Sequence, residues 1–101
     1  MTPKVNIGEV LSFQFKLSNK SKSASKIRLE YGIYYLRANG TLSKKVFKIS
    51  EKMYAGNTVT TISKEQSFKR ITTRKFYTGS HEVSVIINGK EMEKKAFELV
   101  E

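Results

Sequence analysis

The side chains that could do chemistry in this 101-residue chain are few, and most of them are basic. Histidine occurs once, as His81, while aspartate and cysteine do not occur and nine glutamates supply all the acidic side chains. A lone histidine needs a positioned nucleophile or an orienting acid to act in catalysis, and no such partner stands out. Without cysteine there is no thiolate metal site, and one histidine makes no histidine-rich one. The sequence therefore predicts a domain that is not an enzyme, with no cofactor, no metal and a structural His81.

The basic side chains point to a different chemistry, the binding of an anionic partner. The net charge is +10, and residues 44–75 carry nine basic and two acidic groups while residues 76–101 carry a net charge of −2. Such asymmetry favours nucleic acid as the partner, although scattered lysines also keep a small β-domain soluble. The candidate nucleic-acid-binding residues are Arg37, Lys44, Lys45, Lys48, Lys69, Arg70, Arg74 and Lys75.

Two further features have a functional and a structural interpretation. The hydroxyls and guanidinium of Thr72-Thr73-Arg74 could donate to one phosphate, or they could cap turns and pair with a glutamate. Tyr34 and Tyr35 must lie on opposite faces if they share a strand. The exposed one could stack a base near Arg37, or it could cover the core with its hydroxyl in water.

The elements that must position these residues are strands, because apolar residues recur with a period of two. Alternation is clearest in residues 11–18 and 26–38, where Asn39-Gly40 then predicts a hairpin turn. Asn88-Gly89 predicts a second hairpin between residues 81–87 and 91–100. Further strands are expected at 43–53 and 58–63, with a loop over 19–25, a turn at 55–57 and an irregular crossover over 64–78.

About seven short antiparallel strands, with no convincing helix, predict an all-β fold. An immunoglobulin-like β-sandwich fits best, since the long crossover suits a strand that changes sheet, and a five-stranded OB-type barrel is the alternative. We expect a single domain over residues 1–101. Its core is predicted to contain Leu11, Phe13, Phe15, Leu17, Leu29, Tyr31, Ile33, Val83, Val85 and Phe97.

The composition also bears on the compartment. No apolar run approaches the roughly 20 residues that span a bilayer, and the first residues have no apolar signal core behind them. With no cysteine to form disulfides, the sequence predicts a soluble domain in a reducing, cytoplasmic compartment with no membrane partner.

Two stretches, residues 34–48 and 67–81, resemble the C-terminal region of DNA alkylation repair-type proteins. The similarity lies in the Arg37-Ala38-Asn39-Gly40 turn, in Val46-Phe47-Lys48, and in the Ser67-Phe68-Lys69, Thr72-Thr73-Arg74 and Gly79-Ser80-His81 groups. It extends over nearly the whole chain, including Ile7-Gly8-Glu9 and Ile87-Asn88-Gly89. The chain departs from the family pattern at Tyr34, Lys44 and Thr78, where His, Pro and Pro are expected.

The resemblance implies a C-terminal β-domain appended to a larger protein of HEAT-like helical repeats. In that family base excision depends on the helical repeats, so the resemblance carries no catalytic residue over to this chain. The function expected is therefore that of a non-catalytic accessory domain of a repair-type protein. It would bind DNA weakly and without sequence preference through a basic face, or alternatively dock onto the helical repeat domain or another protein partner.

Overall fold

The strands of the protein were traced in a computed structural model, which describes residues 3–69 and 75–101. Seven β-strands account for most of the described chain. They are β1 (Lys4–Asn6), β2 (Val10–Asn19), β3 (Ser25–Leu36), β4 (Leu42–Tyr54), β5 (Thr58–Ser67), β6 (Gly79–Ile87) and β7 (Lys90–Val100). The described residues contain no helix that is long and apolar enough to cross a membrane.

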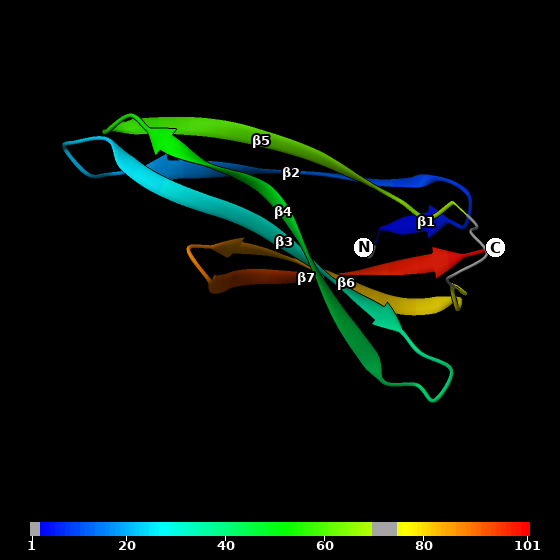
Figure 1. The fold of residues 1–101 in the computed structure, drawn as a ribbon. Coiled ribbons are helices and arrows are strands. Elements are labelled where there is room, and N and C mark those ends of the chain that lie inside the picture. Colours follow the sequence, from blue (N-terminus) through cyan, green and yellow to red (C-terminus); the bar gives the residue numbers. More distant parts are fainter. Residues whose placement is uncertain (1–2, 70–74) are drawn as a thin grey trace.

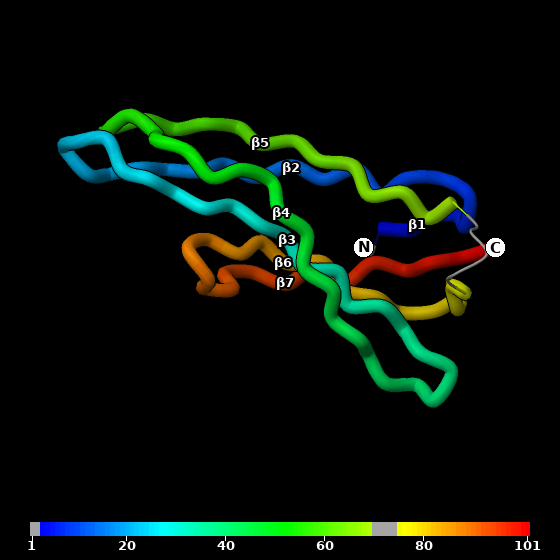
Figure 2. Tube along the Cα trace, viewed as in Figure 1, coloured from blue at the N-terminus to red at the C-terminus, as the bar shows by residue number. Residues whose placement is uncertain are grey.

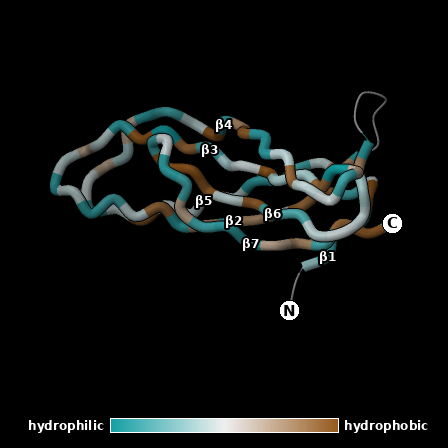
Figure 3. The backbone as a smooth tube through the Cα atoms, turned by 90° about the horizontal axis from the view of Figure 1, so that it is seen from below, coloured by the Kyte–Doolittle hydropathy of each residue, from teal (hydrophilic) through white to brown (hydrophobic). Residues whose placement is uncertain are grey.

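The strands form two sheets that face each other across the core (Figure 1). One sheet has five strands in the order β1-β7-β6-β3-β4, and the other pairs β2 with β5. Odd-numbered residues of β3, such as Leu29, Tyr31 and Ile33, are buried against β2, so the even-numbered ones lie on the opposite side. We call that opposite side the outer face of the five-stranded sheet. Hydrophobic and hydrophilic segments alternate along the tube in Figure 3, as expected for strands with one buried side.

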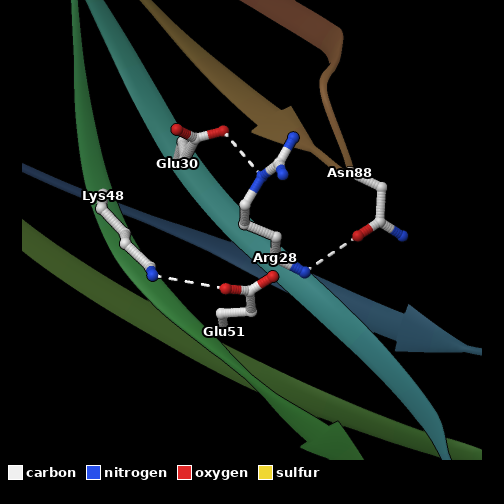
Figure 4. A network of polar contacts seen from close by, with 5 residues as sticks. All are labelled: Arg28, Glu30, Lys48, Glu51 and Asn88. Carbon is white, nitrogen blue, oxygen red and sulfur yellow. Dashed lines mark hydrogen bonds and ion pairs between the residues drawn. The ribbon is translucent and has the colours of Figure 1, made fainter.

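The predicted turns join the predicted strands. At Asn88-Gly89 both residues have positive φ, 50° and 83°, which is the requirement of a two-residue type I′ turn. The Asn88 side chain accepts the Arg28 backbone N–H at 2.9 Å, so this turn is also tied to β3 (Figure 4). In the β3–β4 turn the Gly40 N–H donates to the Arg37 carbonyl at 3.0 Å, and Gly40 takes φ 84°. The β3–β4 hairpin projects beyond the rest of its sheet (Figure 2).

The core consists of two clusters rather than one. The larger contains Tyr31, Ile33, Phe68 and Phe97, and the smaller contains Leu17, Ile27, Leu29 and Tyr54. Six of the ten expected core residues are buried, whereas Phe13, Phe15, Val83 and Val85 are only partly buried. The reason is that β1 pairs with β7 only at Glu98–Val100. Along the rest of β7 no strand covers the side of the sandwich, and the space between β2 and β7 is left open beside these four residues.

Two strand boundaries differ from the predicted ones. β1 was not predicted, and it pairs with β7 in parallel, so the fold is not entirely antiparallel. β5 runs to Ser67 instead of ending at Ser63, and it pairs with β2 over its full length. The crossover between the sheets is therefore shorter than residues 64–78, and its described parts are residues 68–69 and 75–78.

Candidate nucleic-acid interface

The first region that holds predicted binding residues is one end of the sandwich. There the β3–β4 turn, residues 37–41, and the described ends of the crossover lie on the same side of the molecule (Figure 1). Next to them the end of β3 lies close to the start of β6, because a Cβ added at Gly79 would lie 2.7 Å from Leu36 Cδ2. We call this region the crossover end.

Phe68 fixes the start of the crossover. Its ring is fully buried, with centroids 5.3 Å from Phe76, 5.6 Å from Phe97 and 6.0 Å from Tyr35. Its backbone N–H donates to the Glu9 carbonyl and its carbonyl accepts the Gly8 N–H, both at 2.9 Å. The two ends of the crossover are thus held by an aromatic cluster to which Phe68 and Phe76 both belong.

The cations of the crossover end project from this fixed frame. Lys69 and Lys75 stand directly beside the anchored Phe68 and Phe76, and both are exposed. The Lys69 backbone N–H donates to Ser67 Oγ at 3.1 Å, and Lys75 Nζ lies 5.4 Å from the Tyr77 ring centroid. Arg37, in the β3–β4 turn, is also exposed. Among the described residues none of these three cations has an ion-pair partner.

The β4 lysines are placed differently from one another. Lys44 and Lys48 pair in register with Tyr34 and Glu30 and lie on the outer face, whereas Lys45 pairs with Ile33 on the core side. Lys45 Nζ lies 5.4 Å from the Phe47 ring centroid, at the edge of the sheet. The three lysines are therefore divided between two faces, as alternation along a strand requires.

On the outer face, both lysines are held by carboxylates. Lys48 Nζ is 3.4 Å from Glu51, beside the Arg28–Glu30 ion pair at 3.3 Å (Figure 4). Lys44 Nζ is 3.0 Å from Glu91 of β7. These cations are less available to a nucleic acid than the unpaired cations of the crossover end.

Glu91 is a functional candidate that the sequence interpretation missed. The Tyr34 hydroxyl lies 2.9 and 2.7 Å from its two carboxylate oxygens, and Ser84 Oγ donates to Oε2 at 2.8 Å. These hydrogen bonds, that from Tyr34 first, together with the Lys44 ammonium, lower the pKa of Glu91 to about 2. The Glu91 carboxylate in turn raises the pKa of Lys44. The predicted Asn39-Gly40 hairpin places Tyr34 beside Lys44, but no local signal could have indicated Glu91 or Ser84.

Two of the candidate residues cannot be placed. Arg70 and Arg74 lie outside the described residues, as does the whole of the Thr72-Thr73-Arg74 group. They remain predictions from the sequence.

His81 is a packed residue, as predicted. It is fully buried on β6, with ring centroids 5.5 Å from Phe97, 6.1 Å from Phe68 and 6.3 Å from Tyr35. Nδ1 is 3.1 Å from the Gly79 carbonyl, and Nε2 has no hydrogen-bond partner among the residues that the structure describes. Burial lowers the pKa of His81, so the ring is held neutral inside the crossover end.

The hollows of the surface offer little for catalysis. The larger, about 710 Å³, is an open depression over β2 and β5 where Ser12 Oγ donates to Glu65 at 3.3 Å. A serine activated as a nucleophile needs a base and donors for the developing charge, and His81, the histidine of this chain, is buried in the core. No group of three or more potential metal ligands occurs in residues 3–69 and 75–101.

The two facing sheets, one with the strand order β1-β7-β6-β3-β4 and the other with β2 paired to β5, form an immunoglobulin-like β-sandwich. This is the fold expected from the sequence. The chain belongs to the family described as the C-terminal Ig-like domain of the uncharacterised protein YhaZ, which matches residues 1–101. As a small C-terminal domain of this kind, it is an accessory module and not an enzyme by itself.

Known relatives contain this domain as a minor part. The uncharacterised protein YhaZ of Bacillus subtilis (strain 168) is 41% identical over 96 residues, which are 95% of this chain and 26% of YhaZ. The alkylpurine DNA glycosylase AlkC of Pseudomonas fluorescens, bound to DNA containing an abasic site analog, matches with a TM-score of 0.91 and 32% identity. That match covers 97% of this chain and 27% of AlkC. The chain thus spans about a quarter of the length of each, and its resemblance to DNA alkylation repair proteins is confirmed.

The fold also occurs in proteins of unrelated activity. β-Glucosidase from Listeria innocua matches with a TM-score of 0.81 over 99% of this chain and 15% of the enzyme, at 16% identity. At this identity the likeness shows the fold alone. A β-sandwich of this type is therefore compatible with many functions, and the function must be argued from the surface.

Proposed function

We propose that this domain is an accessory DNA-binding module of a DNA alkylation repair-like protein, and that the crossover end contacts the phosphate backbone. The observation that carries the proposal is the set of exposed, unpaired cations, Arg37, Lys69 and Lys75, that project from an anchored frame. Lys45, at the neighbouring sheet edge, and Arg70 and Arg74 would add to them.

Physical chemistry sets the strength and character of such binding. Each phosphate that a lysine or arginine neutralises releases counterions, and the slope of log K against log salt is about −0.9 per contact. Three or four contacts give weak binding, with a Kd of roughly 1–100 µM at physiological salt. The described residues contain no helix, and the cations proposed here contact phosphates rather than base edges, so sequence preference is expected to be small. A similar domain occurs in AlkC, whose structure contains DNA, which supports DNA as the partner.

The test is fluorescence anisotropy of a labelled duplex at 50 and 150 mM salt with a triple variant, Arg37→Gln, Lys69→Gln and Lys75→Gln. Loss of three phosphate contacts is expected to weaken binding at least about tenfold at 50 mM salt and to make the salt slope shallower by about 2.7. The matched control is Lys20→Gln, Lys22→Gln and Lys26→Gln, which removes the same charge from exposed residues at the opposite end of β3. We expect less than about threefold weakening there, since only the long-range field changes. Equal losses in both triple variants would contradict the proposal.

A second function, docking onto a helical repeat domain of the same protein, is favoured by a different observation. The half-buried Phe13 and Phe15 of β2 face Val83 and Val85 of β6 across a narrow groove of about 80 Å³ at the open side of the sandwich. Apolar surface that is partly open is a feature of protein contacts as well as of imperfect packing. The test is the variant Phe15→Ser. Docking would be favoured if this variant leaves DNA binding by the isolated domain intact but weakens DNA binding by the longer parent protein.

A further inference from the structure

The Glu91 carboxylate lies at the centre of a set of donors that come from three other strands. Tyr34 is on β3, Lys44 on β4, Ser84 on β6 and Glu91 itself on β7, and the three donors reach the carboxylate at 2.7–3.0 Å. Lys94, also on β7, places its Nζ 4.7 Å from the Tyr34 ring centroid, and Lys44 Nζ is 5.6 Å from the same centroid. Two hydroxyls and the Lys44 ammonium therefore surround one carboxylate on the outer face, and the Lys94 ammonium lies beside them over the Tyr34 ring.

A glycine on the strand beneath makes this arrangement possible. Gly32 lies in the middle of β3, and a Cβ at this position would come within 2.9 Å of Ser84 Oγ and 3.2 Å of Lys44 Cε. Glycine in a strand interior weakens the strand and often marks a position that something else must approach closely. Here the missing side chain leaves room for Lys44 to cross β3 and reach Glu91.

The donor set matches the groups that proteins use to hold phosphate oxygens. The hydroxyls of Tyr34 and Ser84 and the ammonium group of Lys44 all donate to the carboxylate, and Lys94 supplies a second ammonium group beside the Tyr34 ring. Glu82 lies on the same face, in register with Tyr34, but makes no ion pair within the described residues. Glu91 keeps about a quarter of its side-chain surface exposed, so it can leave the site without opening the core. The partners it would release come from separate strands whose backbones are fixed by the sheet.

We propose that Tyr34, Ser84, Lys44 and Lys94 form an anion site that takes a phosphodiester group of DNA, and that Glu91 is its resident internal ligand. DNA competes with Glu91 for the same donors, so Glu91 weakens DNA binding at the outer face. The identity of the ligand rests on the DNA-binding function proposed above. The existence of the anion site does not.

The variant that tests the proposal is Glu91→Gln, measured by duplex anisotropy at 50 and 150 mM salt. The glutamine carbonyl oxygen still accepts from Tyr34 and Ser84, but Lys44 loses its ion pair. We expect DNA affinity at 50 mM salt to rise about threefold to tenfold and the salt slope to become steeper by about 0.9, since one more phosphate contact forms. Circular dichroism before each titration checks that the variant is folded.

Two controls separate the site from the overall charge. Glu82→Gln removes one negative charge from the same face, at a residue that makes no ion pair within the described part of the chain, and less than about a twofold change is expected. The double variant Glu91→Gln, Lys44→Gln restores the wild-type net charge and is expected to lose the gain. An affinity of Glu91→Gln that is equal to that of Glu82→Gln, or below that of the wild type, would overturn the proposal.

A second probe, inorganic phosphate, distinguishes this proposal from the DNA-binding function. We expect phosphate to cause saturable NMR shifts of the Ser84 and Lys44 amides in Glu91→Gln and none in the double variant. If wild-type protein binds no DNA, the function proposed above fails, and these shifts still show whether the anion site exists. Phosphate shifts without tighter DNA binding would assign the site to free phosphate and overturn the assignment of a DNA phosphodiester as its ligand. The absence of phosphate shifts in Glu91→Gln would overturn the anion site, whatever the DNA affinity.

Discussion

The crossover end and the outer face of the five-stranded sheet hold their cations by opposite means. At the crossover end the backbone is fixed by buried rings, Phe68 above all, while the cationic groups of Lys69 and Lys75 have no carboxylate beside them in the described structure. On the outer face each of the two lysines has a carboxylate beside it, Glu91 for Lys44 and Glu51 for Lys48. Residues of the same type are thus available to a polyanion in one region and already neutralised in the other.

The largest expected effect concerns the frame of the crossover end. Phe68→Ala removes a fully buried ring that has four other rings around it, and it is expected to lower the free energy of unfolding by about 3–5 kcal/mol. The counterpart on the outer face is Val46→Ala, a residue that is 45% exposed, for which we expect a loss within about 0.5 kcal/mol. Urea denaturation followed by circular dichroism measures both. Similar losses of unfolding free energy for the two variants would mean that the packing that stabilises the fold is not concentrated at the crossover end.

The second effect is the order in which acid weakens the two regions. His81 has a lowered pKa in the folded state, so its contribution to stability is present above the unfolded value of 6.5 and is lost as the pH falls below it. Glu91 also has a lowered pKa, and its contribution is present above about 4.5 and is lost as the pH falls from there towards about 2. The crossover end is therefore expected to weaken first on acidification.

Melting temperatures between pH 7 and pH 2.5 test this order. His81→Gln is expected to flatten the curve between pH 7 and pH 5, whatever its effect on stability at pH 7. Glu91→Gln is expected to leave that interval unchanged and to flatten the curve below pH 4.5. If His81→Gln melts with the wild-type pH dependence above pH 5, the neutral buried histidine is not what makes this region acid-sensitive.

Much of the fold was predictable because the strands carry their own periodicity. The alternation of Leu11 to Leu17 identified β2 directly, and the turn residues Asn39-Gly40 and Asn88-Gly89 identified the β3–β4 and β6–β7 hairpins. β1 could not be found this way, since three residues with one buried side chain, Val5, show no period. The end of β5 was missed because its core-side positions include the polar Lys64 and Gln66, and Gln66 accepts the buried Tyr31 hydroxyl at 2.6 Å.

The candidate site was less predictable, for a reason of chain distance. Which face Lys44 and Lys48 occupy follows from strand alternation alone, and the structure agrees with it. The pairing of Lys44 depends on the register of strands that are distant in the sequence, since its partner Glu91 is on β7. Lys48 pairs with Glu51, three residues along its own strand. Net charge counts both lysines as available, and for Lys44 only the packing of the sheet reveals its partner.

The smallest expected effect lies within the outer face, between its two lysine–glutamate pairs. Lys48–Glu51 is exposed on both sides at 3.4 Å, so a double-mutant cycle is expected to give a coupling of about 0.3–0.5 kcal/mol. Lys44–Glu91 is closer, at 3.0 Å, and is held in place by Tyr34 as well, which puts its coupling towards the upper limit of about 1 kcal/mol. Both couplings are expected to fall in 1 M salt, where the Debye length is about 3 Å. A larger coupling for Lys48–Glu51 than for Lys44–Glu91 would mean that the hydroxyl donors satisfy Glu91 without the lysine, and that Lys44 is as free as the cations of the crossover end.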